Sequence, residues 1–384
     1  MHGPDSENMT NVKKILFVAF DLEIGGAEWV ILNLCNEFVE NGVHVTLITN
    51  RETPLVSRLD SRVKIIYSGG GICSRAGILR SFVNISGHLK HNRYHAVFAT
   101  QRWISSILSL AHCITRSDAQ LVIRESATNF AQILQRMNKI KQMLIRTLFT
   151  FAYRRADLLI ANSEGTFRSL KKNRLVGRNK AIVVINNPVD IGMVQRQSLG
   201  KPPFDLPKGL GRTIVSIGRL SPQKRMQDII LAVKVLRLHG RNVFLFILGE
   251  GSERLGLERL VEENGLNDVV KLTGKLDNPY PILKAADVFV LASKFEGFGM
   301  VIVEALALGV PVVATDIPDG PQCILNFGEY GKLYPVGNID RLVENIEYFL
   351  EKRPKRETLV SRAKDFEKSK IASIYMKQIG LNPL

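Results

Sequence analysis

The chain has 384 residues and 45% of them are hydrophobic, which is enough apolar surface for two ordinary domain cores. Its formal charge of +16 indicates an acidic partner, such as a nucleic acid, an anionic membrane surface or a phosphorylated substrate. The four cysteines match no metal-ligand or redox-pair spacing, so we interpret them as small apolar residues in a reducing cytosol. A secretory signal and a stretch long enough to cross a bilayer are both missing from the sequence, so a cytoplasmic enzyme is expected.

Short apolar runs recur through the first half of the chain, separated by turns and helical patterns. The first run, over residues 14–20, leads through Gly25-Gly26 into a helical pattern, which predicts a strand, a glycine turn and a helix. The full Gly-x-Gly-x-x-Gly spacing is absent, which argues against a NAD site. Further strands are predicted over residues 43–49, 63–67, 95–100, 121–124, 158–162 and 181–185.

Polar side chains follow two of these predicted strands. Gln101 follows the strand over residues 95–100, and Arg124 and Glu125 stand at the end of the strand over residues 121–124. Ligands of open parallel sheets bind just outside the carboxyl ends of the strands, so these three side chains are candidate ligand contacts. The histidines of this region receive no role, because a single histidine at the end of an element is more often structural or solvated.

Basic residues are concentrated in residues 131–180, which hold twelve Lys and Arg against two acids and so carry +10 of the +16. Apolar residues alternate with these cations at helical spacing, which predicts one broad apolar face with cations beside it. The apolar set is Ile133, Leu134, Met137, Ile140, Met143, Leu144 and Leu148. Such a face can pack on a domain core, or it can bind an anionic membrane surface, where each basic residue contributes about 1 kcal/mol. The charge favours the membrane.

Residues 200–209 are dense in proline and glycine, which predicts a linker between two domains. We place the first domain at residues 1–195, the linker at residues 196–210 and the second domain at residues 211–364.

Two cations stand beside the end of a predicted strand in the second domain. Arg219 follows the strand over residues 213–217, and Lys224 stands at the start of the next helix. Both can reach one anion, because the N-terminus of a helix also attracts phosphate. Two later strands end at the glycine turns Gly249-Glu250-Gly251 and Gly274-Lys275-Leu276.

The stretch over residues 288–315 predicts a complete strand, turn, helix and second strand. Gly297 and Gly299 allow a sharp turn that carries Glu296, and Glu304 interrupts an otherwise apolar helix, where an unpaired charge is costly to bury. The two glutamates are either solvated residues or hydroxyl-binding carboxylates. Their place outside a strand end, beside a helix N-terminus that attracts phosphate, favours a ligand with hydroxyls and phosphates, such as a nucleotide sugar.

The segment Glu296-Gly-Phe-Gly-Met-Val-Ile-Val-Glu304 resembles the signature of glycosyltransferase family 4, the retaining transferases of GT-B fold. The resemblance covers essentially the whole chain. It implies an α/β protein of two Rossmann-like, doubly wound domains that face a cleft, with a helix over residues 365–384 that crosses back to the first domain. It also implies that the second domain binds the nucleotide-sugar donor and the first domain the acceptor, without a cofactor.

The family pattern implies a role for each residue that matches it. Glu296 would contact hydroxyls of the transferred sugar and Glu304 those of the ribose, while Arg219 and Lys224 would neutralise the diphosphate; Glu296, Arg219 and Lys224 are the expected catalytic residues. The other expected donor contacts are Gly25, Gly26, Gly249, Lys275, Leu276, Gly297, Phe298 and Gly299.

On the acceptor side, many relatives carry a histidine at a strand end, where this chain offers Gln101, Arg124 and Glu125. These three residues are therefore the expected acceptor contacts, and the residue that handles the proton is not identified.

We therefore expect a metal-independent glycosyltransferase that moves a hexose or N-acetylhexosamine from a nucleotide sugar, with UDP the expected nucleotide, to a lipid-linked glycan. No Asp-x-Asp pair occurs, and such carboxylates commonly hold the divalent cation of metal-dependent transferases. The enzyme is expected at the cytoplasmic membrane face, bound through residues 131–180. A nucleotide-sugar epimerase of the same fold is an alternative. A polyanion-binding or nucleic-acid-binding protein is a further alternative, although the basic segment has few aromatic residues for base stacking.

Overall fold

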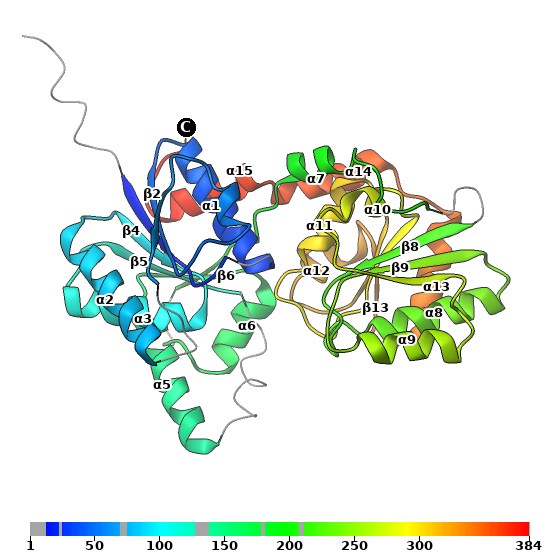
Figure 1. The fold of residues 1–384 in the computed structure, drawn as a ribbon, viewed down its shortest axis with the longest axis horizontal. Coiled ribbons are helices and arrows are strands. Elements are labelled where there is room, and N and C mark those ends of the chain that lie inside the picture. Colours follow the sequence, from blue (N-terminus) through cyan, green and yellow to red (C-terminus); the bar gives the residue numbers. More distant parts are fainter. Residues whose placement is uncertain are drawn as a thin grey trace, which may run out of the picture. The chain divides into compact units, whose positions relative to one another are not determined.

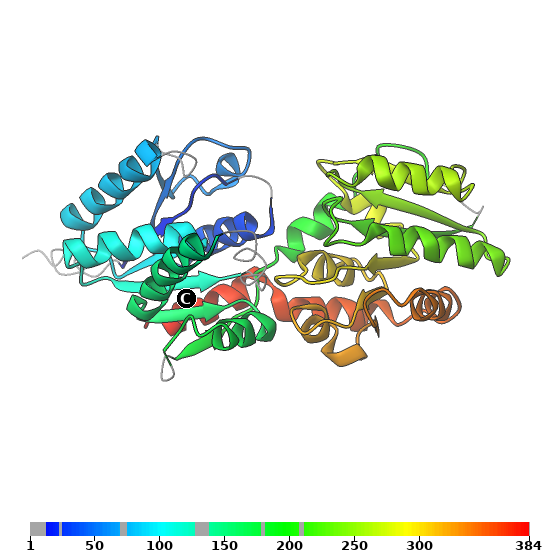
Figure 2. The ribbon, with the colours of Figure 1, turned by 90° about the horizontal axis from the view of Figure 1, so that it is seen from below.

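The structure is a computed structural model that describes residues 13–22, 25–69, 75–126, 138–177, 181–206 and 211–383. Its contacts divide the chain into two compact units. The second unit is Val189–Glu367, and the first unit is the chain up to Pro188 together with the chain from Lys368 onward. Each unit is a parallel sheet covered by helices, as the two ribbon views show (Figures 1 and 2), so the predicted α/β class with two Rossmann-like domains is confirmed.

The first unit contains a seven-stranded sheet in the order β3-β2-β1-β4-β5-β6-β7. All neighbouring strands pair in parallel, and apolar residues on both faces of the central strands explain why the sheet is buried. The strands are β1 Lys14–Val18, β2 His44–Thr49, β3 Lys64–Tyr67, β4 Ala96–Ala99, β5 Gln120–Glu125, β6 Leu158–Ala161 and β7 Ile182–Val184. Each lies within two residues of its predicted position.

Successive side chains along a strand point to opposite faces of the sheet, so their contacts show which helices cover which face of the first unit's sheet. Phe17 and Phe98 pack against Phe38 of α1, whereas Leu16 and Val97 share a core with α2, α3 and α5. Helix α15 lies beside α1. The helices are α1 Gly26–Glu40, α2 Arg75–His91, α3 Arg102–Thr115, α5 Lys139–Arg155, α6 Glu164–Lys172 and α15 Lys368–Gln378, with a short 3-10 helix η1 over Val56–Arg58.

Helix α2 is not predicted from the sequence. It contains two glycines, which lower helix propensity, and the packing of Ile85 and Leu89 on the core stabilises it instead.

The second unit contains a six-stranded parallel sheet in the order β10-β9-β8-β11-β12-β13. Its strands are β8 Arg212–Ile217, β9 Val243–Leu248, β10 Val270–Gly274, β11 Val288–Leu291, β12 Val312–Thr315 and β13 Lys332–Tyr334. Its helices are α7 Ile191–Gln197, α8 Met226–Leu238, α9 Arg254–Glu263, α10 Tyr280–Lys284, α11 Met300–Ala307, α12 Pro321–Ile324, α13 Ile339–Glu351 and α14 Arg356–Ala363, with the 3-10 helices η2 Asn326–Gly328 and η3 Lys364–Phe366.

The chain passes between the units at Pro188 and again at Lys368. Val189, Ile191 and Val194 are buried in the core of the second unit, so α7 belongs to that unit. From the sequence, the first domain was placed up to residue 195 and the linker over residues 196–210. Proline and glycine mark the surface loop, but they do not show that α7, which precedes the loop, packs in the second unit. Helix α15 belongs to the first unit.

Arg124 is a buried cation that joins three segments of the first unit. It is 1% exposed, its Nε donates to the hydroxyl of Tyr375 at 2.9 Å, and its Nη2 donates to the side-chain oxygen of Asn187. No acid pairs with it in the part of the chain that the structure describes. Because a buried guanidinium without hydrogen-bond partners is costly, these neutral groups fix α15 and the segment before Pro188 to β5.

We expect Tyr375→Phe to destabilise the protein by about 1–3 kcal/mol, because the substitution leaves the buried Nε of Arg124 without its acceptor. The measurement is urea unfolding followed by the fluorescence of the first unit's tryptophans. Tyr67→Phe is the control, since Tyr67 is 47% exposed in the same unit. Equal unfolding free energies for the two variants would show that the contact stabilises nothing.

Candidate functional site

The predicted donor residues of the second unit lie at the carboxyl ends of its strands. Arg219 and Lys224 follow β8, and Glu296 lies on the loop after β11. Helix α11 then begins at Met300, and Gly299 before it adopts a left-handed φ of +89°, a conformation that favours glycine. This is the edge of an open parallel sheet at which ligands bind.

Lys224 and Glu296 form a largely buried ion pair, in which the Lys224 Nζ contacts the Glu296 Oε1. Glu296 is 6% exposed, and Ser293 Oγ donates to the same carboxylate oxygen at 2.5 Å. The cation expected on the diphosphate and the carboxylate expected on the sugar are therefore neighbours. Ser293 was missed by the sequence analysis, although its place directly after a buried apolar run was a signal.

The loops that carry these two residues are held together by backbone contacts. Lys294 N–H donates to the Gln223 carbonyl at 2.8 Å, and the Gln223 side-chain amide donates to the Phe295 carbonyl at 2.8 Å. Thr315 Oγ1 donates to the Ser293 carbonyl at 2.7 Å. The position of Lys224 beside Glu296 is thus fixed by the fold and does not depend only on the attraction of their charges.

Close backbone contacts explain two of the glycines at this edge. A Cβ on Gly249 would lie 1.9 Å from the Gly218 carbonyl oxygen, and one on Gly320 would lie 1.6 Å from the Phe298 carbonyl oxygen. The turn after β9 and the loop after β12 therefore pack directly on the loops that carry the candidate residues. The side chain of Phe298 is 2% exposed and packs on Phe366, so only its backbone is free to face a ligand.

Glu304 lies on α11 and is half-buried. Its carboxylate makes no hydrogen bond or ion pair with the residues that the structure describes, and burial raises its pKa to about 7. A carboxylate that lacks a partner inside the protein is suited to accept hydrogen bonds from hydroxyl groups of a ligand.

The remaining predicted donor residues of the second unit are more exposed. Arg219 is exposed and has no ion pair within the described ranges. Lys275 is exposed after β10, whereas Leu276 packs partly against the core. Arg219 and Lys275 are therefore cations that remain available to an anionic ligand.

The candidate residues of the first unit lie in two hydrogen-bonded groups. Gly25 is the N-cap of α1, and the Gln101 amide donates to Glu28 in the first turn of that helix at 3.2 Å, so Gln101 lies near the Gly25-Gly26 turn. Glu125 is 4% exposed and accepts from Arg102 Nε at 2.9 Å.

Glu125 also accepts a hydrogen bond from Tyr153. The pKa of the Tyr153 hydroxyl is raised well above its ordinary value by burial and then by the adjacent Glu125 carboxylate. Arg124 is enclosed as described above. The acceptor-side roles of Gln101, Arg124 and Glu125 remain predictions.

Within the described ranges, no three side chains of the types His, Cys, Asp and Glu are grouped so that they could hold a metal ion. None of the described helices combines the length and apolar character needed to span a bilayer.

Two family models match this chain. The one described as "Glycosyl transferases group 1" matches residues 204–366, and the one described as "Glycosyltransferase Family 4" matches residues 24–192. Together they cover most of both units, and the Glu296 to Glu304 segment lies within the residues that the first of them matches.

The curated relatives include two bacterial glycosyltransferases. The chain is 29% identical over 264 residues to N-acetylgalactosamine-N,N'-diacetylbacillosaminyl-diphospho-undecaprenol 4-alpha-N-acetylgalactosaminyltransferase of Campylobacter jejuni, covering 68% of this chain and 69% of that protein. It is 31% identical over 238 residues to the lipopolysaccharide core biosynthesis glycosyltransferase LpsE of Rhizobium meliloti, covering 60% of this chain and 66% of that protein.

Solved structures show the same fold. The lipopolysaccharide outer core galactosyltransferase WaaB superposes with a TM-score of 0.70 at 20% identity over 96% of this chain and 99% of the other. Anabaena HepE in complex with UDP and glucose superposes with a TM-score of 0.76 at 22% identity over the same shares. The chain belongs to the family 4 glycosyltransferases of GT-B fold.

We expect Glu304→Gln to raise the melting temperature, and to do so more at high pH than at low pH. The folded-state pKa of about 7 exceeds the ordinary value of 4.5, so ionisation of Glu304 destabilises the wild type as pH rises through this window. The difference in melting temperature between variant and wild type should grow from about pH 4.5 to pH 7 and then level off. Glu262→Gln, on an exposed position of α9, is the control and should show no such growth.

Proposed function

We propose that the protein transfers a hexose or N-acetylhexosamine from a UDP-sugar, with retention of configuration, to a hydroxyl of a lipid-linked glycan, and that it needs no metal ion. The observation that carries this proposal is the group formed by Lys224, Glu296 and Ser293 at the carboxyl edge of the second unit. It supplies one cation and one carboxylate beside two further charged groups that are open to a ligand, Arg219 and Glu304.

Donor binding would exchange the partners inside this group. The diphosphate would attract Lys224, while sugar hydroxyls would donate to Glu296, which Ser293 keeps in place. Ribose hydroxyls would donate to Glu304, whose carboxylate has no partner in the described chain. Each charge would then be matched by a ligand group of complementary chemistry.

Departure of the nucleoside diphosphate leaves negative charge on its phosphates. Arg219 and Lys224 would stabilise that charge where a divalent cation does so in metal-dependent enzymes. The acceptor hydroxyl would attack the anomeric carbon from the face that the nucleotide leaves, and a phosphate oxygen of the leaving group would take its proton. This route needs no protein nucleophile.

The comparisons support the substrate classes. One structural neighbour holds UDP and glucose, and the Campylobacter jejuni relative is named for a diphospho-undecaprenol acceptor. A thermal-shift screen with UDP-sugars and with nucleotide sugars of other bases tests the choice of donor, since a ligand that binds the folded state raises its melting temperature. Protection by another nucleotide and not by UDP would overturn that choice.

Arg219→Ala and Lys224→Ala are each expected to lower kcat/KM. The loss should correspond to about 2–4 kcal/mol of transition-state stabilisation, because each substitution removes a donor aimed at the negative charge that develops on the phosphates. Activity should survive EDTA. The measurement is transfer of sugar from the donor that the screen identifies. Lys234→Ala, on an exposed position of α8, controls for the loss of a positive charge. Full activity in Arg219→Ala, or a loss with EDTA that manganese reverses, would contradict the assignment.

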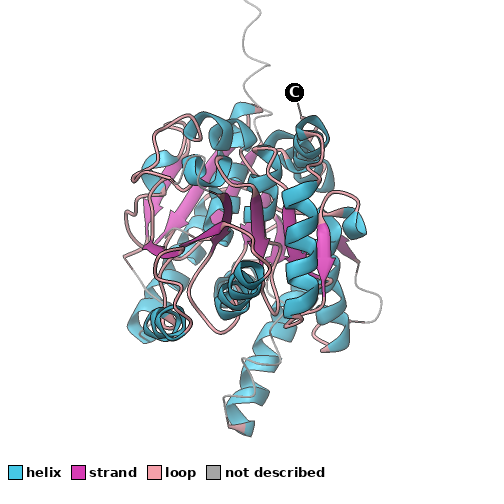
Figure 3. Cartoon of the chain, turned by 90° about the vertical axis from the view of Figure 1, so that its right-hand side faces the viewer, coloured by secondary structure: helices cyan, strands magenta, loops and turns pink. Residues whose placement is uncertain are grey.

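We further propose that an anionic membrane surface binds the first unit through α5. Of the predicted apolar set, Ile133, Leu134 and Met137 lie outside the described residues. On α5, Ile140, Met143 and Leu144 are 68%, 64% and 61% exposed, while Phe149 and Tyr153 on the same helix face the core. Figures 1 and 3 show α5 extending past the helices beside it.

The helices beside α5 also carry exposed apolar side chains. Helix α3 packs between α2 and α5, and Trp103 contacts Phe149 with ring centroids 5.3 Å apart. Leu79 on α2 and Ile114 on α3 are 61% and 62% exposed. Together α2, α3 and α5 hold nine Lys and Arg and no acidic residue. Arg102 is paired with Glu125, and apolar side chains among the other cations match the chemistry of an anionic leaflet.

Wild-type protein is expected to pellet with anionic vesicles, not with neutral ones, and high salt should release it. The double variant Met143→Glu/Leu144→Glu should lose most of this binding, because it replaces exposed apolar groups with charges of the wrong sign. The control is Leu238→Glu/Leu255→Glu, at positions of the second unit that are 77% and 68% exposed. If the wild-type protein stays in solution with anionic vesicles at low salt, the proposed membrane binding is contradicted and a soluble acceptor is favoured.

A further inference from the structure

A polar pocket lies at the amino ends of the strands in the first unit, the edge opposite to the one that carries Gln101 and Glu125. It encloses about 460 Å³. Three neighbouring strands each begin with a basic residue at this place, namely Lys14 of β1, His44 of β2 and Lys64 of β3. Amino edges of parallel sheets are not the usual place for the substrate, so the catalytic site does not account for this cluster.

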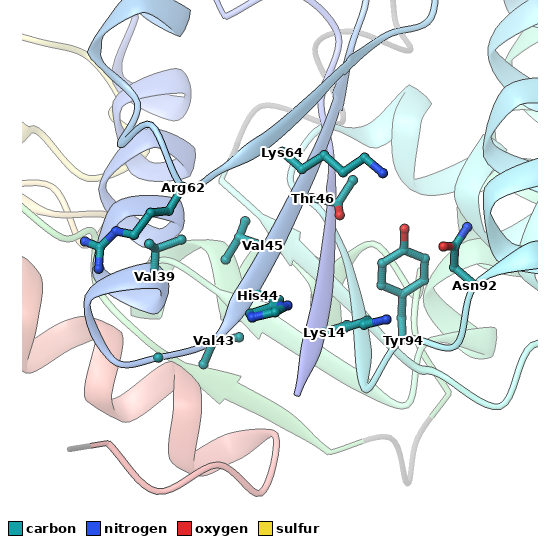
Figure 4. A pocket seen from close by; sticks show the side chains of 11 residues that line it. Lys14, Val39, Val43, His44, Val45, Thr46, Arg62, Lys64, Asn92 and Tyr94 are labelled. Atoms are coloured by element: carbon teal, nitrogen blue, oxygen red, sulfur yellow. The ribbon is translucent and has the colours of Figure 1, made fainter. Parts of the chain in front are cut away.

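The strand register places these basic residues on one face. Lys14 pairs with His44, and Thr46 pairs with Lys64, so the four side chains point to the same side of the sheet. Tyr94 and Asn92, just after α2, form the facing wall. Figure 4 shows Lys14, Lys64, Thr46, Tyr94 and Asn92 gathered there, while Arg62 points away.

The charges at the pocket are not balanced. Arg62 is paired with Asp60 and Glu40, at 2.8 and 2.7 Å, whereas Lys14 and Lys64 make no ion pair with any residue that the structure describes. None of the residues that line the pocket is acidic. Side chains that can donate hydrogen bonds therefore line the space; Tyr94 and Thr46 hydrogen-bond to each other, and none of the described lining residues is a carboxylate that would compete for the donors.

The positive charge of Lys64 also affects His88, a histidine of α2. Burial, followed by the nearby Lys64 and His91, lowers the pKa of His88, and its Nδ1 is buried without a hydrogen-bond partner in the described chain. Lys64 therefore adds to the effect of burial in disfavouring the charged form of His88. An anion in the pocket would relieve the repulsion.

We propose that this pocket binds a phosphate group, held by Lys14 and Lys64 and by the hydroxyls of Tyr94 and Thr46. Lysine ammonium groups act as point charges toward phosphate, and neutral hydroxyl donors complete its coordination. The phosphate can belong to a soluble phosphate ester or to the headgroup of an anionic lipid. Both present the same oxygens to the site.

Titration and vesicle flotation with the full-length protein test this proposal. Pyrophosphate is titrated into wild type and into Lys14→Gln/Lys64→Gln by calorimetry, and both proteins are floated with phosphatidylglycerol vesicles. Lys13→Gln is the matched control, because Lys13 is the exposed neighbour of Lys14 and does not line the pocket. Circular dichroism melting establishes that the variants fold.

We expect the double variant to weaken at least one of the two interactions by about tenfold relative to Lys13→Gln, since charge-assisted contacts are lost. A weaker pyrophosphate affinity with unchanged flotation identifies a soluble phosphate as the ligand, and weaker flotation, with or without a weaker pyrophosphate affinity, identifies a lipid headgroup. Unchanged affinity and unchanged flotation in the folded double variant overturn the proposal. Neither measurement involves sugar transfer, so failure of the phosphate-site proposal is distinguishable from failure of the proposed enzymatic function.

Discussion

Parallel pairing of every strand is the constraint on which the arrangement of this protein depends. In a parallel sheet the carboxyl ends of all strands lie at one edge. Residues that follow different strands therefore meet at that edge even when they are far apart in the sequence. Lys224 and Glu296 are 72 positions apart and still form an ion pair, because β8 and β11 are adjacent strands. The same rule places the basic starts of β1, β2 and β3 together at the opposite edge of the first unit.

Close backbone packing holds the loops together at the carboxyl edge of the second unit's sheet. Gly249 and Gly320 let neighbouring loops approach to distances that no side chain would permit. Gln223 and Thr315 add hydrogen bonds between neighbouring loops, and Ser293 donates to Glu296 within one loop. The charged groups of the edge are therefore positioned by neutral contacts, and a ligand can exchange ionic partners there without rebuilding the loops. Such preorganisation is what electrostatic stabilisation of a leaving group requires.

Three unusual charges in the molecule differ in how they are compensated. Arg124 donates from Nε and Nη2 to neutral acceptors and serves the packing of α15, while its buried Nη1 has no partner among the described residues. Glu304 is half-buried without a partner among the described residues, and burial raises its pKa. Lys64 is exposed, and no described acidic residue lines the pocket beside it. Only the last two leave a charge open to a ligand, which separates candidate sites from structural contacts.

Sequence alone determined the periodic elements, the glycine turns and the Glu296 to Glu304 motif, because these features are local and their residues are adjacent in the chain. It therefore predicted both sheets, whereas the donor-side roles of residues in the second unit remain predictions. It could not predict that α7 packs in the second unit, that Ser293 orients Glu296, or that Ile140 and Met143 remain exposed while Phe149 is buried. Those outcomes depend on which distant segments meet, and only the tertiary structure decides whether an apolar face finds a core and whether a charge finds a partner.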